Sequence, residues 1–182
     1  MITNESELST KQYIVSAILE LLGLKHFELI SVKEIVKKAG ISRSTFYLHF
    51  QNKFDLIDTV RDDITTTFLS FYGHKENASL AVNKTTYYIC QHIYDYRNFY
   101  QYEFDNPSYV QELSNTLAEK LLQVYDDKSY AIFASFGTIG YLTFWVKDGF
   151  QLSPDEAAAE LVKIGVTDWS TLSNGIKIRN IL

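Results

Sequence analysis

The chain has 182 residues, of which 46% are hydrophobic and 21% charged, and its formal net charge is -5. This length and composition predict a folded protein with one sizeable core or two smaller units, and they exclude a chain that is disordered throughout. The single cysteine, Cys90, excludes an intramolecular disulfide and agrees with the reducing cytoplasm, where we expect the protein to act.

The N-terminal third of the sequence predicts three helices, with no signal peptide before them because the first 13 residues lack an apolar run. An apolar stripe places the first helix over residues 10–22. Ser31 and Glu34 form a capping box that starts the second helix, and Gly40 can end it in the left-handed conformation. After a turn of about three residues, a third helix covers residues 43–50, and this spacing is typical of a helix-turn-helix.

The remainder of the chain also predicts helices. A long fourth helix over residues 53–70 is expected to connect two units, and residues 72–79 are expected to form a loop. The helices expected after this loop are residues 79–96, 98–104, 109–124, 128–147 and 154–164. The tail, residues 167–182, has weak periodicity and is not placed. The sequence therefore predicts an all-α protein of about nine helices, with a three-helix helix-turn-helix domain in residues 1–60 and a second helical domain in residues 61–182.

Basic residues are concentrated in residues 31–53, although the chain as a whole is acidic. This stretch holds five Lys or Arg residues and one acid, Glu34, which gives it a local charge of +4. A local excess of positive charge favours binding to a polyanion such as DNA. A solvated helix face is the ordinary alternative for such charges, so the helix-turn-helix spacing is needed to favour the DNA hypothesis.

The third predicted helix has the residue types of a DNA recognition helix. Arg43 lies at the N-terminus of this helix, where a recognition helix approaches the bases. The planar guanidinium group of arginine can donate two parallel hydrogen bonds to the O6 and N7 acceptors of guanine. The hydroxyl and imidazole groups of Thr45, Tyr47 and His49 suit phosphate oxygens, and Lys53 follows closely enough to reach another phosphate. The candidate DNA-binding residues are Lys33, Ser42, Arg43, Ser44, Thr45, Tyr47, His49 and Lys53.

The stretch "TKQYIVSAILELLGLKHFELISVKEIVKKAGISRSTFYLHFQNKFDLI", and above all "AGISRSTFYLHFQNK" within it, resembles the N-terminal domain of TetR-family transcriptional regulators. The resemblance implies a dimer that binds a palindromic operator in double-stranded DNA, with one recognition helix in each half-site. Ser44 and Leu48 depart from the residues that are commoner in the family. The base preference at these two positions therefore stays open.

Residues 87–104 contain eight aromatic side chains. At helical spacing, Tyr88, His92, Tyr96 and Phe99 would share one face, and aromatic bodies with polar tips suit a pocket for a small aromatic or apolar effector. An aromatic stripe is also the ordinary composition of a protein core, and this alternative stays open. We expect His92 to be held by hydrogen bonds and to be neither a metal ligand nor a catalyst.

The longest uncharged run, residues 129–146, predicts a buried helix better than a membrane span because serine, threonine and glycine dilute it. The pattern "FASFGTIGYLTFWVKDGFQLSPDEAAAEL" resembles the C-terminal domain of a TetR branch that includes regulators linked to dihydroxyacetone kinase genes. The resemblance implies that the last two helices pair with their copies in a four-helix dimer interface; packing within one chain is the alternative. The candidate interface residues are Phe133, Gly137, Gly140, Tyr141, Phe144, Ala157 and Leu161.

These patterns favour a homodimeric transcriptional regulator, with repression as the expected mode, that a small effector controls through residues 61–182. The alternative is a regulator of the same family whose second domain binds a protein partner and no small ligand. An enzyme is disfavoured because the sequence has no phosphate-binding glycine loop, no cysteine or histidine pair at metal spacing and no nucleophile elbow. No cofactor, metal or membrane partner is expected.

Overall fold

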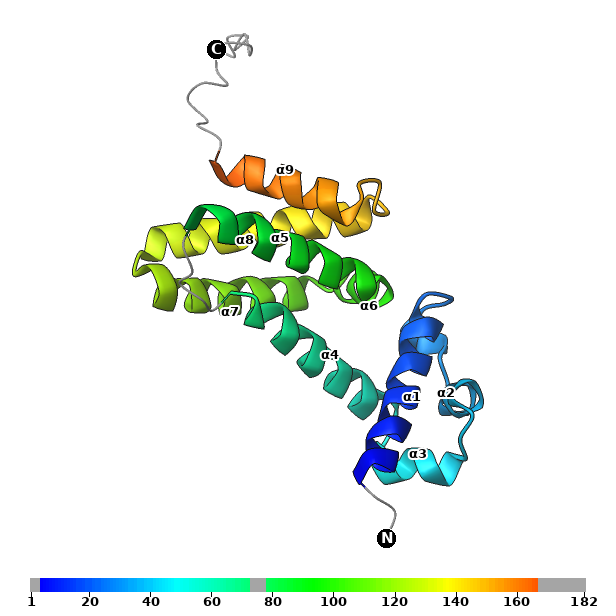
Figure 1. Cartoon of the computed structure of the whole chain (residues 1–182). Coiled ribbons are helices and arrows are strands. Elements are labelled where there is room, and N and C mark those ends of the chain that lie inside the picture. Colours follow the sequence, from blue (N-terminus) through cyan, green and yellow to red (C-terminus); the bar gives the residue numbers. More distant parts are fainter. Residues whose placement is uncertain (1–3, 73–77, 167–182) are drawn as a thin grey trace.

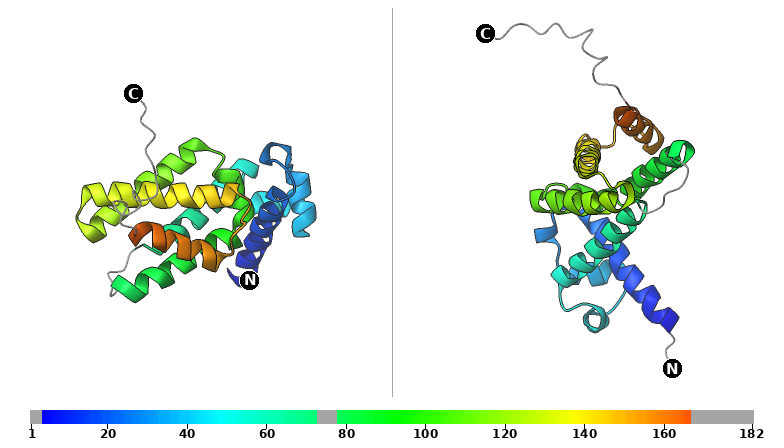
Figure 2. Two further views of the ribbon diagram at one scale, coloured as in Figure 1. Left: turned by 90° about the horizontal axis from the view of Figure 1, so that it is seen from above. Right: turned by 90° about the vertical axis from the view of Figure 1, so that its left-hand side faces the viewer.

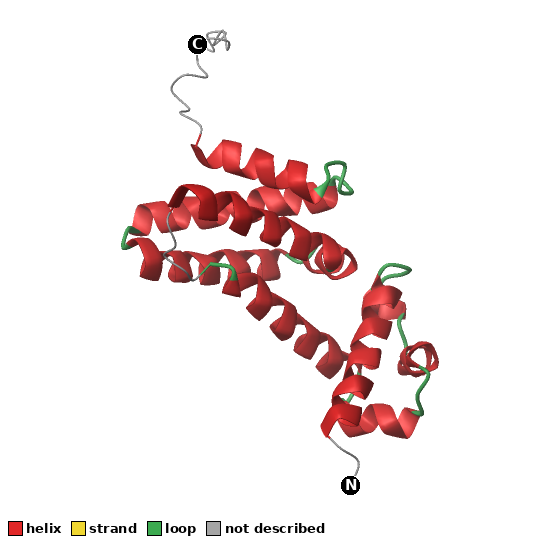
Figure 3. Cartoon of the chain, in the orientation of Figure 1, coloured by secondary structure: helices red, strands yellow, loops and turns green. Residues whose placement is uncertain are grey.

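The computed structural model describes residues 4–72 and 78–166, and every regular element in these two ranges is helical (Figure 3). This confirms the all-α prediction. The elements are α1 (Asn4–Leu22), the short 3-10 helix η1 (Phe27–Leu29), α2 (Val32–Ala39), α3 (Arg43–His49), α4 (Lys53–Ser70), α5 (Ala78–Asp95), α6 (Arg97–Glu103), α7 (Pro107–Tyr125), α8 (Lys128–Lys147) and α9 (Pro154–Val166).

The helices form a small head and a larger bundle (Figure 1). The head contains α1, α2, α3 and the first turns of α4, and the bundle contains α5 to α9. Helix α4 runs from the head to the bundle, and α9 lies on the side of the bundle away from α4 (Figures 1 and 2). The predicted tail, residues 167–182, lies outside the described residues.

Most helix boundaries agree with the prediction, and two differ. Helix α1 begins at Asn4, earlier than expected. Helix α7 begins at Pro107, two residues before the expected start at residue 109. Asn106 instead caps α7 by accepting a hydrogen bond from the backbone N–H of Ser108 at 3.1 Å, and proline suits the first helical position because its missing N–H is not needed there.

Part of the apolar core lies in the head, beneath α3. Ile14, Ile18, Ile35 and Phe46 are each fully buried, and they come from three different helices. Phe50 joins them at 3% exposure, so one side of α3 faces this core. The burial of four large apolar side chains, each contributing roughly 2 kcal/mol, holds α3 against α1 and α2.

Polar contacts join the head to the bundle along α1, α4 and α6. The side chain of Asn98 on α6 donates a hydrogen bond to the carbonyl of Leu19 on α1 at 3.0 Å. Further along, Arg61 on α4 donates to the buried carboxylate of Glu103 at 2.9 Å. Burial raises the pKa of Glu103, and the Arg61 guanidinium partly offsets that rise. An open cleft of about 780 Å³ lies between residues 22–28 and 98–106 at the same junction.

Helix α8 was expected to be a buried helix, but in this chain it buries only one face. Ile139, Leu142 and Trp145 are buried against the rest of the bundle, whereas Phe133 and Phe144 are 72% and 63% exposed. Among the described helices, α8 is long and apolar enough to cross a membrane by length and composition, with a mean hydropathy of 1.2. Of its most apolar 18-residue stretch, 33% is buried inside the protein. The exposed apolar face is therefore the feature of α8 that needs an explanation.

Candidate nucleic-acid interface

The turn between α2 and α3 is built from capping groups. Gly40 ends α2 in the left-handed conformation with φ of 68°, and its N–H donates to the carbonyl of Val36. Glycine suits this position because it has no Cβ to clash there. Ser42 then caps α3 by accepting a hydrogen bond from the backbone N–H of Thr45 at 3.0 Å. The spacing of α2 and α3 is thus fixed by residues 40–42.

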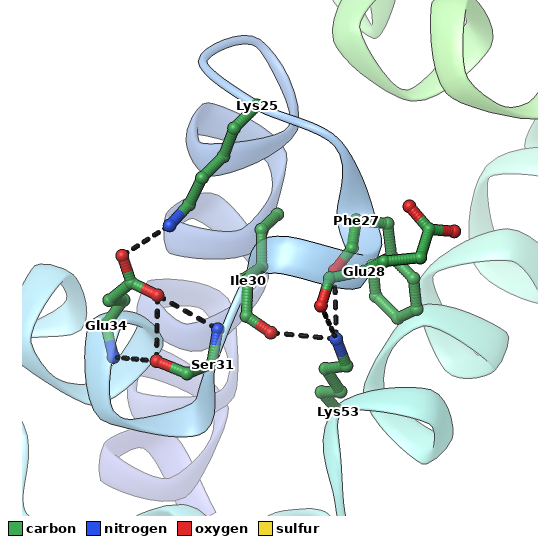
Figure 4. Close-up of polar contacts among 7 residues, drawn as sticks. All are labelled: Lys25, Phe27, Glu28, Ile30, Ser31, Glu34 and Lys53. Atoms are coloured by element: carbon green, nitrogen blue, oxygen red, sulfur yellow. Dashed lines mark hydrogen bonds and ion pairs between the residues drawn. The ribbon is translucent and has the colours of Figure 1, made fainter.

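The start of α2 is held by a second set of polar contacts (Figure 4). The Glu34 carboxylate accepts hydrogen bonds from the N–H and the hydroxyl of Ser31 at 3.0 and 2.8 Å. It also pairs with Lys25, which lies in the segment between α1 and η1. The hydrogen bond from Lys25, followed by those from Ser31, lowers the pKa of Glu34 to about 2.

The outer face of α3 is polar and accessible. Arg43, Ser44 and Tyr47 are exposed, and Thr45 and His49 are half-buried. One guanidinium nitrogen of Arg43 donates to the Tyr47 hydroxyl at 3.0 Å, and the guanidinium carbon lies 5.5 Å from the Tyr47 ring centroid. This contact holds Arg43 along the helix and uses one of its five N–H donors.

The hydroxyls at the N-terminus of α3 form a small network. The Ser42 oxygen lies 2.7 Å from the Ser44 hydroxyl and 2.8 Å from the Thr45 hydroxyl. One turn further on, Leu48 is 83% exposed, so its apolar side chain projects from the same outer region. An exposed leucine beside polar groups can contact a thymine methyl in the major groove.

Ion pairs inside the head reduce the number of cations available to DNA. Lys38 pairs with Glu20 of α1 at 2.6 Å, and Glu34 pairs with Lys25. Lys33 and Lys37 are exposed, lie one turn apart on α2, and have no ion pair among the described residues. Lys37 is not among the predicted DNA-binding residues, although its spacing of four residues from Lys33 could have indicated it.

Lys53 has a different environment from the other predicted DNA-binding residues. Its ammonium group donates hydrogen bonds to three backbone carbonyls of the head, those of Phe27, Glu28 and Ile30, at 2.8–3.0 Å (Figure 4). An ammonium group has three N–H donors, so each of them has a partner. The structure therefore brings Lys33, Arg43 and Tyr47 to the accessible surface and directs Lys53 into the head.

The predicted effector residues do not form one face. Tyr88 and Tyr96 are 44% and 36% exposed, whereas His92 is buried and Phe99 is fully buried. The chain turns at Tyr96, between α5 and α6, so Phe99 follows a new helix axis and packs on Tyr109. Helical spacing counted through Tyr96 therefore failed to predict the position of Phe99.

His92 instead lies in an aromatic cluster formed by α4, α5 and α6. Its Nε2 atom lies 3.1 Å from the Tyr100 hydroxyl, within hydrogen-bonding distance. Its ring centroid lies 5.6 Å from that of Phe71 and 4.9 Å from that of Tyr96. Burial lowers the pKa of His92, and a hydrogen bond to the backbone of Ile64 opposes that effect. These contacts agree with the expected hydrogen-bonded histidine.

The predicted dimer residues fall into two groups. Phe133, Gly137, Gly140 and Phe144 form an exposed stripe along α8. Tyr141 and Ala157 lie where α8 meets α9, because the Tyr141 hydroxyl donates to the carbonyl of Ala157 at 3.0 Å, and Ala157 is fully buried within this one chain. Leu161 of α9 is half-buried against the apolar core. The second group therefore packs within the chain, whereas the first group is not covered by the residues that the structure describes.

Comparisons with known proteins identify the family. Residues 14–60 match the family model of bacterial regulatory proteins of the tetR family, and residues 81–165 match that of a transcriptional regulator C-terminal region. The uncharacterized HTH-type transcriptional regulator YxbF of Bacillus subtilis (strain 168) is 21% identical over 160 residues, which cover 81% of this chain and 42% of YxbF. A second HTH-type regulator of that organism, YvdT, is 38% identical over 53 residues, which cover 29% of this chain and 27% of YvdT. The matched part is thus less than half the length of either relative.

Solved structures of similar fold include three regulators. NalD of Pseudomonas aeruginosa, described as the secondary repressor of the MexAB-OprM multidrug efflux pump, has a TM-score of 0.65 at 16% identity, covering 88% of this chain and 95% of NalD. A transcriptional regulator from Aquifex aeolicus VF5 has a TM-score of 0.65 at 19% identity, covering 84% of this chain and 95% of the Aquifex chain. The dihydroxyacetone kinase operon activator DhaS has a TM-score of 0.62 at 16% identity, covering 85% of this chain and 93% of DhaS. With its two family matches and its helix-turn-helix head, this chain belongs to the TetR family of bacterial transcriptional regulators.

Proposed function

We propose that the protein is a homodimeric, sequence-specific repressor that acts in the cytoplasm and releases a palindromic operator when a small effector binds. The observation that carries the DNA-binding proposal is the outer face of α3, where Arg43 is held by Tyr47 beside exposed Ser44 and Leu48. In this proposal Arg43 contacts a base edge, and Lys33, Thr45 and His49 contact phosphates. Repression is the simpler mode because an occupied operator blocks transcription without any further contact.

Salt dependence tests the DNA contacts. A dimer that neutralises about eight phosphates should give a plot of log association constant against log salt concentration with a slope of about -7. Fluorescence anisotropy with a labelled duplex at several salt concentrations measures this slope. An association constant that does not change with salt would contradict the phosphate contacts.

The exposed stripe of α8 supports the homodimer. Phe133 and Phe144 present large apolar side chains, and Gly137 and Gly140 lie between them. A methyl group added at either glycine would meet no described heavy atom within 4 Å, so the backbone of α8 is accessible there. Small residues between large ones allow two helices to pack closely. A second copy of the chain, presenting the same stripe, is therefore the proposed partner.

Substitution of Gly140 with leucine tests this surface. The protomer has room for the new side chain, so its fold should be preserved, whereas close packing against a second α8 would be blocked. Asn115→Leu is the matched control because Asn115 is exposed on α7, away from the buried positions Leu113 and Leu117. Sedimentation velocity should give a dimer for the wild type and the control, and a monomer for Gly140→Leu. A wild-type monomer, or a dimer that survives Gly140→Leu, would contradict the proposed interface.

The aromatic cluster around His92 supports the effector proposal. Next to it, the Tyr72 ring lies 5.5 Å from Phe68, and the Tyr72 hydroxyl is buried without a hydrogen-bond partner among the described residues. A buried polar group that lacks a partner is costly, and a ligand that binds there can satisfy it. Aromatic rings beside such a hydroxyl suit a small aromatic or apolar effector that carries one polar group.

A path from this cluster to the head runs along α4. Phe68 of α4 and Phe71, which directly follows α4, pack on His92, and α4 continues without a break to Lys53 in the head. An effector that separates these rings would tilt α4 and change the distance between the two recognition helices of the dimer. That distance must match one helical turn of DNA, about 34 Å, so a small tilt lowers the affinity.

Native mass spectrometry of protein purified from its own host tests for the effector. The proposal expects a retained small molecule, and addition of that molecule should weaken binding to DNA. A protein partner recovered in place of any small molecule would support the alternative, in which the bundle binds another protein.

A further inference from the structure

Lys53 joins two parts of the head that are far apart in the chain. Its ammonium group, at the first residue of α4, donates to the carbonyls of Phe27, Glu28 and Ile30, which lie 23 to 26 residues earlier (Figure 4). We call these three hydrogen bonds the Lys53 bridge. The same ammonium group lies 4.6 Å from the centroid of the Phe27 ring, which is 3% exposed. The bridge therefore has carbonyl oxygens and an aromatic ring around a single positive charge.

The position of Lys53 in α4 makes this arrangement informative. The N-terminus of a helix carries a partial positive charge, so a cation is unfavourable there. The carbonyls at the end of η1 carry the opposite partial charge and favour a cation. Because these carbonyls occupy all three donors of Lys53, a contact with DNA phosphate would require at least one of the three bonds to break.

The bridge closes the helix-turn-helix at both of its ends. Ile30, which accepts the shortest of the three bonds at 2.8 Å, is followed by Ser31, the cap of α2. Lys53 itself follows the end of α3 by four residues. The segment from Ser31 to Asn52 contains both α2 and α3. The residues that flank it, Ile30 and Lys53, are therefore joined directly by one of the three hydrogen bonds.

We propose that Lys53 is a positioning residue, which fixes the orientation of α3 for base reading and does not bind phosphate. This inference rests on the proposed DNA-binding function, and it differs from the phosphate contact expected from the sequence. Base contacts depend on angstrom-scale placement of α3, whereas phosphate contacts by flexible side chains tolerate small rotations. Loss of the bridge should therefore weaken binding to the specific site much more than binding to unrelated DNA.

Lys53→Met tests the proposal, with Lys33→Met as the matched control. Methionine keeps an unbranched apolar stem on Phe27 and removes the charge and the donors. Lys33 is exposed and has no ion pair among the described residues. Two duplexes of equal length serve as probes: one recovered by selection from random oligonucleotides, and one with the same bases in scrambled order. Affinities are measured at several salt concentrations, below the temperature at which circular dichroism shows any unfolding.

The positioning role predicts two results for Lys53→Met. The ratio of specific to non-specific affinity should fall about tenfold, which is the size of effect that one mismatched base pair produces. The salt slope should stay at the wild-type value. Lys33→Met should do the opposite, with an unchanged ratio and a slope that is smaller in magnitude by about 1.8 for the two protomers.

Two other results for Lys53→Met would overturn the proposal. A smaller salt slope with an unchanged ratio would show that Lys53 binds phosphate. An unchanged ratio and slope in the folded variant would show that the bridge contributes only to stability. Phe27→Leu removes the ring beneath the ammonium group and keeps the charge, so it provides a second variant if Lys53→Met does not fold. It should lower the ratio, and a wild-type ratio in Phe27→Leu would also count against the proposal.

Hydrogen exchange of the free protein tests the bridge without DNA. The amides of Leu29 and Ile30 donate to the carbonyls of His26 and Phe27 in η1, and they should exchange faster in Lys53→Met than in Lys33→Met. Equal exchange in the two variants would mean that the bridge does not hold this turn. Failure to select any duplex would count against the proposed DNA binding alone, because the exchange experiment would still decide whether the bridge exists.

Discussion

In the head, capping side chains fix the starts of α2, α3 and α4, whereas the contact that joins α4 to the bundle links residues far apart in the chain. Ser31, Ser42 and Asn52 each accept a backbone N–H within three residues. By contrast, Arg61 of α4 pairs with Glu103 of α6, 42 residues later in the chain. The starts of these helices therefore depend on local signals, whereas the packing of the helices on one another depends on long-range contacts, such as those of Lys38 with Glu20 and of Arg61 with Glu103.

Removing Arg61 from its ion pair with Glu103 should produce the largest change, a loss in the free energy of unfolding. Arg61→Met leaves the Glu103 carboxylate, which is 1% exposed, buried without its cation. Removing one partner of a buried ion pair costs about 3 kcal/mol, because the remaining charge has no compensation. Urea unfolding followed by circular dichroism measures this change in the free energy of unfolding.

The double variant Arg61→Met with Glu103→Leu is the control for this pair. Removing both charges should recover most of the lost stability, since an apolar pair of similar volume can replace a buried ion pair. If the double variant is as unstable as Arg61→Met, the pair does not act through an uncompensated charge, and the account of how α4 is joined to α6 would have to change.

Arg43→Ala should have the next largest effect, and it acts on the head alone. It removes the proposed base contact and should relax sequence preference at one position at a cost of about 1–3 kcal/mol in binding. Selection of bound oligonucleotides by the variant and by the wild type measures the change in preference. A variant that binds every site as the wild type does would refute the assignment of base reading to Arg43.

The buried His92 should make the stability of the bundle depend on pH. Burial lowers its folded-state pKa below the ordinary 6.5, so below pH 6.5 the unfolded chain binds a proton that the folded chain does not. The free energy of unfolding should therefore fall as the pH is lowered from 7.5 to 5.5, by at most about 1.4 kcal/mol from this residue.

Urea unfolding at pH 7.5 and pH 5.5 measures this loss. His92→Gln should lose less stability than the wild type over the same range, and His26→Gln, at an exposed position, should match the wild type. Equal losses in His92→Gln and the wild type would mean that His92 does not contribute to the pH dependence.

The two capping boxes allow the head and the bundle to be compared through the same interaction. Ser31 and Ser153 each donate a hydroxyl to a glutamate three residues later at 2.8 Å. Replacement of either serine by alanine should cost about 1 kcal/mol in the free energy of unfolding. Only Ser31→Ala should also weaken DNA binding, because only that cap positions α2. Equal DNA affinities for the two variants would contradict this difference.

The same contrast explains what the sequence could predict. The caps at Ser31, Ser42 and Asn52 act over two or three residues, so their helix starts were predicted correctly. The start of α7 was expected at residue 109, although the asparagine before proline in "DNPS", residues 105–108, is a good helix start, as α7 shows. Composition does not indicate which face of α8 stays uncovered, because the apolar run has no polar side; only the family resemblance placed residues of this face at an interface.

The side chains of the two candidate sites were harder to predict than the helices. The outer position of Arg43 and Tyr47 followed from the phase of one short helix. The direction of Lys53 did not, because its carbonyl partners lie 23 to 26 residues away. Likewise, Phe99 was assigned to the wrong face because the change of axis at Tyr96 depends on tertiary packing, which periodicity does not report.

Selection of bound duplexes from random oligonucleotides by the purified wild-type protein tests the central claim most directly. A dimer with one recognition helix per protomer should enrich a palindrome whose half-sites are centred about 34 Å apart, or about 10 base pairs. Enrichment of such a palindrome is the predicted result. Recovery of unrelated sequences with no shared motif, or of a single half-site without its inverted copy, would contradict the sequence-specific homodimer.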